Sequence, residues 1–226
     1  MMGDMMKIQV ITLFPQMFDG VLGNSMLWKA SDRGIVSYEM IDLREFGLGP
    51  RRQVDDTPYG GGDGMLLMIE PLVAAIELAK SKDPTAKVIL PTPRGQVYKQ
   101  SHAKAFAAED SGLIFVCPRY EGYDERVLPW IDEQFCIGNY VLTGGELPVM
   151  VMIDSVVRLL PGVLGGEMSA EIESFQDDDQ NIEFPQYTRP EEFHGAKVPD
   201  VLLSGNHAEI AKWRQQNSHK SQTAQL

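Results

Sequence analysis

Three glycine-punctuated loops carry the residues best suited to chemistry in this chain. They are YGGGDGM at 59–65, PRYEGYDER at 118–126 and IGNYVLTGGELP at 137–148. Glycine lets the backbone approach a ligand closely and adopt positive φ angles. Three such loops in one chain predict a pocket built largely from main chain, suited to a flat heteroaromatic group.

The loop at 118–126 concentrates charge beside two aromatic rings. Its charged side chains are Arg119, Glu121, Asp124, Glu125 and Arg126. Tyr120 and Tyr123 could stack on an aromatic ligand. The loop follows a strand-like run, and ligands of parallel sheets bind beyond the carboxyl ends of the strands. The alternative is a solvated, salt-bridged surface loop, but the proline and glycine within it favour a fixed shape.

The loop at 137–148 also follows a strand-like run directly. Its backbone groups can hydrogen-bond the edge of an adenine ring, while Ile137, Leu142 and Pro148 supply apolar walls. The alternative is an ordinary turn before a helix. The embedded YVL favours the binding interpretation, because a plain turn does not need exposed apolar residues.

Other common chemical motifs are absent. The sequence contains no G-x-G-x-x-G, no Walker A loop, no C-x-x-C and no H-E-x-x-H. The four histidines show no spacing typical of metal ligands. We therefore expect no zinc site, and we do not expect the protein to be a nucleoside triphosphatase.

Strand-like and helix-like segments alternate over the first 160 residues and must position these loops. The expected strands are 7–13, 35–41, 87–90, 112–117 and 133–137, rich in Val, Ile and Phe as strands buried on both faces should be. The expected helices are 70–82, 96–108 and 146–160. This alternation predicts an α/β fold with a mostly parallel sheet and helices on both faces.

The chain changes character after Pro161-Gly162, which ends the last of these helices. We expect a first domain at 1–161 and a flexible, acidic linker at 162–181. Residues 182–226 are expected to form a small helical domain, in which Ser204 caps a helix that contains Trp213.

Composition restricts location and partners. The net charge of −12 argues against nucleic-acid binding, but Arg44, Arg51 and Arg52 form a local basic cluster, so a basic surface stays open. Cys117 and Cys136 lie in apolar runs and are expected to be buried and reduced. With neither a signal peptide nor an apolar run of the roughly 20 residues needed to cross a bilayer, we expect a cytoplasmic protein without a membrane anchor.

Six motifs taken together resemble one enzyme family. They are VDDTPYGGGDGM, RYEGYDERV, IGNYVLTGGELP, IDSVVRLLPGVLG, PQYTRPEEFHG and VPDVLLSGNHAEIAKWR, which occur in this order between 54 and 214. The chain thereby resembles the bacterial tRNA (guanine-N1)-methyltransferases, which methylate N1 of the guanosine at tRNA position 37. The resemblance implies a SPOUT fold with a deep trefoil knot and a homodimer with active sites shared between subunits. It also implies S-adenosylmethionine as methyl donor and a dependence on Mg²⁺, for which the sequence assigns no ligands.

The resemblance also implies roles for individual residues. Cofactor contacts fall on Pro91, Pro118, Arg119, Glu121, Ile137, Gly138, Asn139, Tyr140, Val141, Leu142, Gly144, Gly145 and Pro148. Arg158 matches an arginine that holds the target guanine, and Asp55 matches an aspartate that the partner subunit contributes at the tRNA site, where Tyr120 is also expected. Glu173 matches the proposed general base.

Three positions depart from the family pattern. Pro118 stands where many members have glycine, Asn139 replaces a usual aspartate, and Glu173 replaces an aspartate in DSF. The resemblance and the chemistry together predict that Glu173 removes the N1 proton while Arg158 stabilises charge on O6. Both residues also have a purely structural alternative. Glu173 could be one linker carboxylate among several, and Arg158 could be a plain i, i+4 partner of Asp154.

Two other functions stay open at this level. The first is a related knotted methyltransferase that acts on another RNA site. The second is a non-catalytic RNA-binding relative, which the three departures from the family pattern suggest.

Overall fold

The computed structural model describes residues 5–164, 173–175 and 181–220. The chain divides into two compact units, Met1–Gly165 and Gly166–Leu226. The predicted linker at 162–181 lies mostly outside the described residues, and the predicted domain boundaries stay predictions. Within the described ranges no helix is both long and apolar enough to span a membrane.

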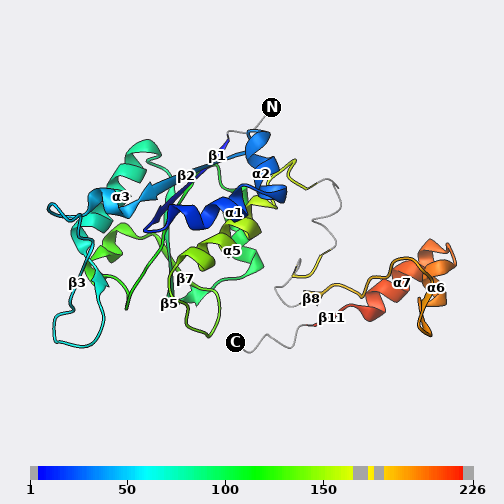
Figure 1. Ribbon diagram of the computed structural model, residues 1–226. Helices are drawn as coiled ribbons and strands as arrows, with labels where there is room; N and C mark the ends of the chain where they lie inside the picture. The colour runs from blue at the N-terminus through cyan, green and yellow to red at the C-terminus, as the bar shows by residue number, and fades with distance from the viewer. Residues whose placement is uncertain (1–4, 165–172, 176–180, 221–226) are drawn as a thin grey trace. The chain divides into compact units, whose positions relative to one another are not determined.

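The first unit is built on a five-stranded parallel sheet, which confirms the expected α/β class (Figure 1). Its strand order is β2-β1-β6-β5-β7. The strands are β1 (Met6–Thr12), β2 (Val36–Asp42), β5 (Lys87–Val97), β6 (Leu113–Val116) and β7 (Glu133–Cys136). Their carboxyl ends therefore meet at one edge of the sheet, where the sequence places its loops.

Helices cover both faces of this sheet (Figure 1). One face carries α1 (Asp19–Leu22), α2 (Ser25–Asp32), α4 (Gln100–Ala108) and α5 (Glu146–Val157); the other carries α3 (Ile69–Lys82) and the 3-10 turns η2 (Leu43–Phe46) and η3 (Glu125–Trp130). Side chains alternate between the faces along each strand, as period-2 geometry requires. In β6, Phe115 packs with α5, whereas Ile114 packs with α3.

Two helix boundaries differ from the predicted ones by three or more residues. The helix expected to begin at residue 96 begins at Gln100, because Gln96 and Val97 pair with β7 as part of β5. The helix expected to end at residue 160 ends at Val157, since a residue before proline avoids the helical region and the chain tightens into i→i−3 turns there. Helices α1 and α2 were not predicted.

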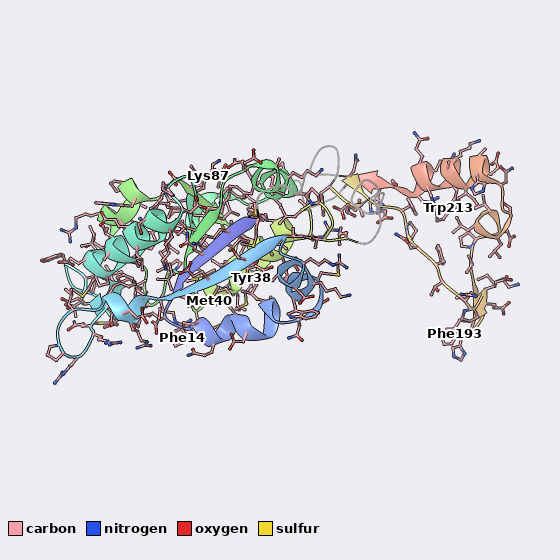
Figure 2. All side chains as sticks on the ribbon, turned by 90° about the horizontal axis from the view of Figure 1, so that it is seen from above. Phe14, Tyr38, Met40, Lys87, Phe193 and Trp213 are labelled. Carbon is pink, nitrogen blue, oxygen red and sulfur yellow. The ribbon has the colours of Figure 1, made fainter. Side chains whose placement is uncertain are left out.

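The remaining described strands are short: β3 (Asp55–Asp56), β4 (Leu66–Leu67), β8 (Asn181–Ile182), β9 (Glu192–Phe193), β10 (Ala196–Lys197) and β11 (His219–Lys220). The second unit also holds α6 (Asp200–Leu203) and α7 (His207–Asn217), which agrees with the expected helical character. Trp213, labelled in Figure 2, belongs to α7. Its ring lies against Phe184 and Tyr187 at centroid distances of 6.4 and 6.3 Å. The cap of α7 is Asn206 rather than the predicted Ser204, because the Asn206 amide oxygen accepts from the first-turn N–H groups.

Candidate functional site

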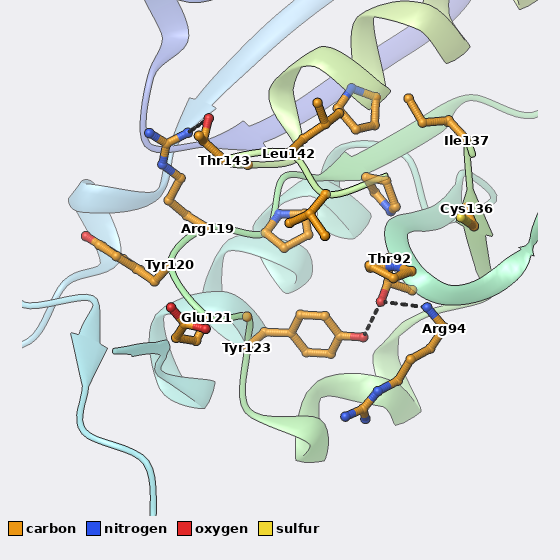
Figure 3. Close-up of a pocket in the computed structure, with 18 of the residues that line it drawn as sticks. Thr92, Arg94, Arg119, Tyr120, Glu121, Tyr123, Cys136, Ile137, Leu142 and Thr143 are labelled. Atoms are coloured by element: carbon orange, nitrogen blue, oxygen red, sulfur yellow. Dashed lines mark hydrogen bonds between the residues drawn. The ribbon is translucent and has the colours of Figure 1, made fainter. Parts of the chain in front are cut away.

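A pocket of about 460 Å³ opens at the carboxyl edge of the sheet (Figure 3). It is formed by the ends of β5, β6 and β7 and by the loop that leads into α5. Its volume is in the range of sites that enclose small organic ligands. The predicted residues that line it are Pro91, Pro118, Arg119, Tyr120, Glu121, Ile137, Gly138, Tyr140, Val141, Leu142, Gly144, Gly145 and Pro148.

An irregularity in β5 shapes one wall of the pocket. Pro91 and Gln96 both pair with Phe135 of β7, so the four residues 92–95 have no partner in β7 and protrude as a bulge. Gly95 permits this, because a Cβ there would lie 2.4 Å from the Phe135 nitrogen. The Thr92 hydroxyl oxygen, carried outward by the bulge, accepts hydrogen bonds from the Tyr123 hydroxyl at 3.5 Å and the Arg94 N–H at 3.4 Å (Figure 3).

The loops at 118–126 and 137–148 meet through their backbones. The Gly145 N–H donates to the Pro118 carbonyl at 2.7 Å, and Arg119 and Gly144 form an isolated antiparallel bridge. A Cβ at Gly145 would lie 2.3 Å from Pro118 Cδ and 2.8 Å from the Cys117 Cα. This contact therefore requires glycine, and it fixes the two loops against each other.

The start of the 137–148 loop is a fixed turn with an apolar outer surface. Gly138 has φ +154°, and the Tyr140 N–H donates to its carbonyl at 2.9 Å. The Cys136 thiol donates to the same carbonyl at 3.1 Å; this cysteine is only half-buried and lines the pocket, contrary to the expectation that both cysteines are buried. Val141 at the tip is 91% exposed.

Two arginines and two glutamates give the pocket its charge. Arg119 lies over the Phe14 ring at 4.8 Å. It also donates to the Thr143 hydroxyl at 3.4 Å, and both residues are labelled in Figure 3. Arg94 and Glu125 form an exposed ion pair at the opposite wall. The fourth charge is Glu121, so the site offers carboxylates as well as cations.

Tyr120 joins the pocket to Asp55. Its backbone has φ +61°, an unusual conformation for a residue with a Cβ. Partial burial raises the pKa of the Tyr120 hydroxyl, and the Asp55 carboxylate, to which it donates a hydrogen bond, raises this pKa further; Arg44 and Arg119 act in the opposite direction. Asp55 therefore lies near the mouth of its own chain's pocket through Tyr120, although it does not line the pocket. The role that the resemblance implies for it, as an aspartate contributed by the partner subunit, stays a prediction.

Not every predicted feature meets at this pocket. Asn139 and the loop at 59–65 do not line it; that loop instead packs on Glu121, where a Cβ at Gly64 would lie 2.4 Å from the Glu121 Cγ. Arg158 is the C-cap of α5, about 18 Å along the helix axis from the end of α5 that borders the pocket. Glu173 belongs to the second unit, so its role stays a prediction.

Several lining residues escaped the sequence analysis. They are Leu66, Thr92, Pro93, Arg94, Phe135, Cys136 and Thr143, whereas Tyr123 and Glu125 of the predicted loop at 118–126 do line the pocket. A signal for some of them exists, because the TPRG segment directly follows the expected strand at 87–90. The carboxyl-end argument used for the other loops applies to it equally. The bulge that turns this segment into a pocket wall had no comparable signal.

Comparisons with known proteins give a consistent result. A family model described as tRNA (Guanine-1)-methyltransferase TrmD matches residues 6–225. Curated tRNA (guanine-N(1)-)-methyltransferases from Geobacter sulfurreducens and Shouchella clausii are 53% and 51% identical to the chain, each over 94% of it and 86% of the relative. The crystal structure of tRNA (m1G37) methyltransferase from Aquifex aeolicus superposes with a TM-score of 0.77 at 34% identity, over 94% of this chain and 88% of that one.

The contact between the two pocket loops can be tested by adding one methyl group. Gly145→Ala should lower the free energy of unfolding by about 1–3 kcal/mol, because the backbone atoms of Cys117 and Pro118 must move. Gly20→Ala is the matched control, since Gly20 lies in α1 with nothing within 4 Å of an added Cβ. Urea denaturation of both variants measures the effect. Equal midpoints would show that the loops tolerate separation.

Proposed function

The chain belongs to the tRNA (guanine-1)-methyltransferase family, and we propose that it transfers a methyl group from S-adenosylmethionine to N1 of the guanosine at tRNA position 37. The observation that carries this proposal is the pocket at the sheet edge. All the residues assigned to the cofactor by resemblance line it, with the exception of Asn139. They come from three separate segments of the chain, so their convergence is a property of the fold.

The pocket suits S-adenosylmethionine in both size and chemistry. Pro91, Leu142 and Pro148 would hold a flat heteroaromatic ring, while the close-packed glycines leave backbone groups accessible to its edge. Glu121 and Arg119 would face the charged groups of the methyl donor. When bound, S-adenosylmethionine supplies an electrophilic methyl group. The described residues contain no cluster of three or more acidic, histidine or cysteine side chains that could hold a metal ion.

Guanine N1 carries a proton at neutral pH and is a poor nucleophile until that proton is removed. A carboxylate near N1 and a cation near O6 would meet the two demands. We assign the proton transfer to Glu173 and the stabilisation of O6 to Arg158. The linker position of Glu173 would couple its placement to the arrival of tRNA.

A homodimer would bring the separated parts of this site together. Arg158 and the pocket lie at opposite ends of α5 in one chain, whereas Asp55 reaches its own chain's pocket through Tyr120. The outer face of α5 exposes Leu147 and Val151, at 51% and 52%. A second copy packed on this apolar face would cover it and could place its Arg158 beside the first copy's pocket. Active sites shared between subunits follow from this arrangement.

The proposed substrate also fixes partner and location. Arg44 acts on Tyr120 at the pocket mouth, and Arg51 and Arg52 are exposed a few residues further along the chain; these cations would contact the tRNA backbone. In the second unit, Arg214 stacks over Phe184 at 4.8 Å and adds a cationic, aromatic surface. A tRNA substrate implies a cytoplasmic enzyme.

The activity itself is tested with defined transcripts. The purified protein should bind S-adenosylmethionine without tRNA in calorimetry, and it should transfer radiolabelled methyl groups to a tRNA transcript with guanosine at position 37. A transcript with adenosine at 37 is the matched control and should stay unlabelled. Labelling of both transcripts would indicate another RNA site, and binding without transfer to either would indicate a non-catalytic relative.

The role of Glu173 is tested by removing its charge. Glu173→Gln keeps the size of the side chain but cannot accept the proton, so single-turnover methyl transfer should slow by about 10²–10⁴-fold. Glu173→Asp should retain much of the activity. Glu191→Gln, at an exposed acid of the same unit, is the control and should transfer at the wild-type rate. If the two glutamine variants behave alike, Glu173 is not the base.

Shared active sites are tested by complementation. Asp55→Ala and Arg158→Ala should each inactivate the enzyme, since each breaks both sites of its dimer. Mixing the two variants should restore part of the activity, because a hybrid dimer rebuilds one intact site. Native mass spectrometry confirms that subunits have exchanged, and absence of recovery after exchange would contradict sites that combine Asp55 and Arg158 from different subunits.

A further inference from the structure

Glu146 is a buried acid for which the proposed chemistry has no role. It is the first residue of α5 and is 1% exposed. Its Oε1 accepts a hydrogen bond from the Thr12 hydroxyl at 3.0 Å. Its Oε2 has no hydrogen-bond partner among the described residues and lies 3.6 Å from Nη1 of Arg119.

A carboxylate at this depth needs a positive neighbour, because a buried charge is costly unless it is neutralised. The amino-terminal end of α5 contributes a partial positive charge, and the Arg119 guanidinium contributes a full one. Burial raises the pKa of the neighbouring Cys117 thiol, and the Glu146 carboxylate raises this pKa further. The geometry is therefore that of a buried anion held by one arginine.

This arginine lines the pocket, and its other contacts are weak. The Arg119 side chain is 25% exposed and rests on the Phe14 ring, with a long hydrogen bond of 3.4 Å to Thr143. Gly144 gives the pair its space, since a Cβ there would lie 2.5 Å from Glu146 Oε2 and 2.6 Å from Arg119 Nη1. The strongest restraint on the guanidinium is thus the Glu146 charge.

Glu146 also connects the ends of three strands, two of which, β6 and β7, border the pocket. Thr12 ends β1, Arg119 follows β6, and Glu146 follows the loop that leaves β7. The other pocket arginine, Arg94, is exposed and paired with Glu125. Arg119 is therefore the pocket cation whose direction is set from inside the protein.

We propose that Glu146 is a positioning residue: its buried carboxylate holds the Arg119 guanidinium at the pocket wall, and the affinity for the methyl donor depends on that charge. The identity of this ligand rests on the proposed function. The arrangement explains why a carboxylate is retained at a depth where an apolar residue would fill the space more cheaply.

The test is a double-variant cycle on the full-length protein with S-adenosylmethionine as probe. Glu146→Gln keeps the shape and the acceptor for Thr12 but turns an amide towards Arg119, so calorimetry should show about 10-fold weaker binding, equivalent to about 1.4 kcal/mol. Arg119→Gln should weaken binding to a similar extent. The double variant should bind within about twofold of either single variant, because both changes remove one interaction.

Thermal unfolding supplies a second readout. Arg119→Gln leaves the buried carboxylate without its countercharge, so it should melt below the double variant. Arg119→Lys keeps a charge opposite Glu146 and should melt above Arg119→Gln, a comparison that holds even if Glu146→Gln does not fold. Glu39→Gln is the matched control. Glu39 lies on β2, away from the pocket, and forms ion pairs with Lys7 and Lys82. The Glu39→Gln variant should bind S-adenosylmethionine with the affinity of the wild type.

Two results would overturn the proposal. If Glu146→Gln is less stable but binds S-adenosylmethionine with wild-type affinity, Glu146 has only a structural role. If the loss of affinity in the double variant equals the product of the two single losses, Glu146 does not act through Arg119. Absence of S-adenosylmethionine binding by the wild-type protein is a separate outcome, which would count against the proposed function instead.

Discussion

The 2.7 Å hydrogen bond from the Gly145 N–H to the Pro118 carbonyl is the constraint on which the site depends. It closes the loop after β6 onto the loop after β7, at a separation where no Cβ fits at Gly145. The bridge from Arg119 to Gly144 joins the same two loops directly beside it. The glycines of this region are therefore needed for packing first, and their accessible backbone serves a ligand as a consequence.

The same edge of the sheet shows how irregularity makes a binding site. A regular β5 would continue past β7 and leave no wall; the bulge at 92–95 turns the chain outward and carries Thr92 and Arg94 to the ligand side. Tyr123 then anchors the bulge through the Thr92 hydroxyl. A pocket of about 460 Å³ thus arises where the ends of β6 and β7, each followed by a tight loop, meet the bulge within β5.

Helix α5 links this pocket to assembly. Its inner face is buried in the core, its first residue anchors the pocket arginine, and its outer face exposes Leu147 and Val151. Its far end carries Arg158, about 18 Å from the pocket end. A rigid helix cannot bring both of its ends to one site, so a site that uses both ends needs two helices. The proposed dimer meets this requirement with a single self-complementary face.

The sequence by itself determined the fold class, the strands and the two loops that form the pocket, because apolar periodicity, glycine position and the strand-end rule are all local signals. Its motifs also identified the family. Only the tertiary structure decided that the loop at 59–65 packs on Glu121 without lining the pocket, that β5 bulges, and that Glu146 lies buried beside Arg119. These features depend on register and on contacts between residues far apart in the chain. No local pattern encodes them, since the same residues would be tolerated in an ordinary turn, strand or helix start.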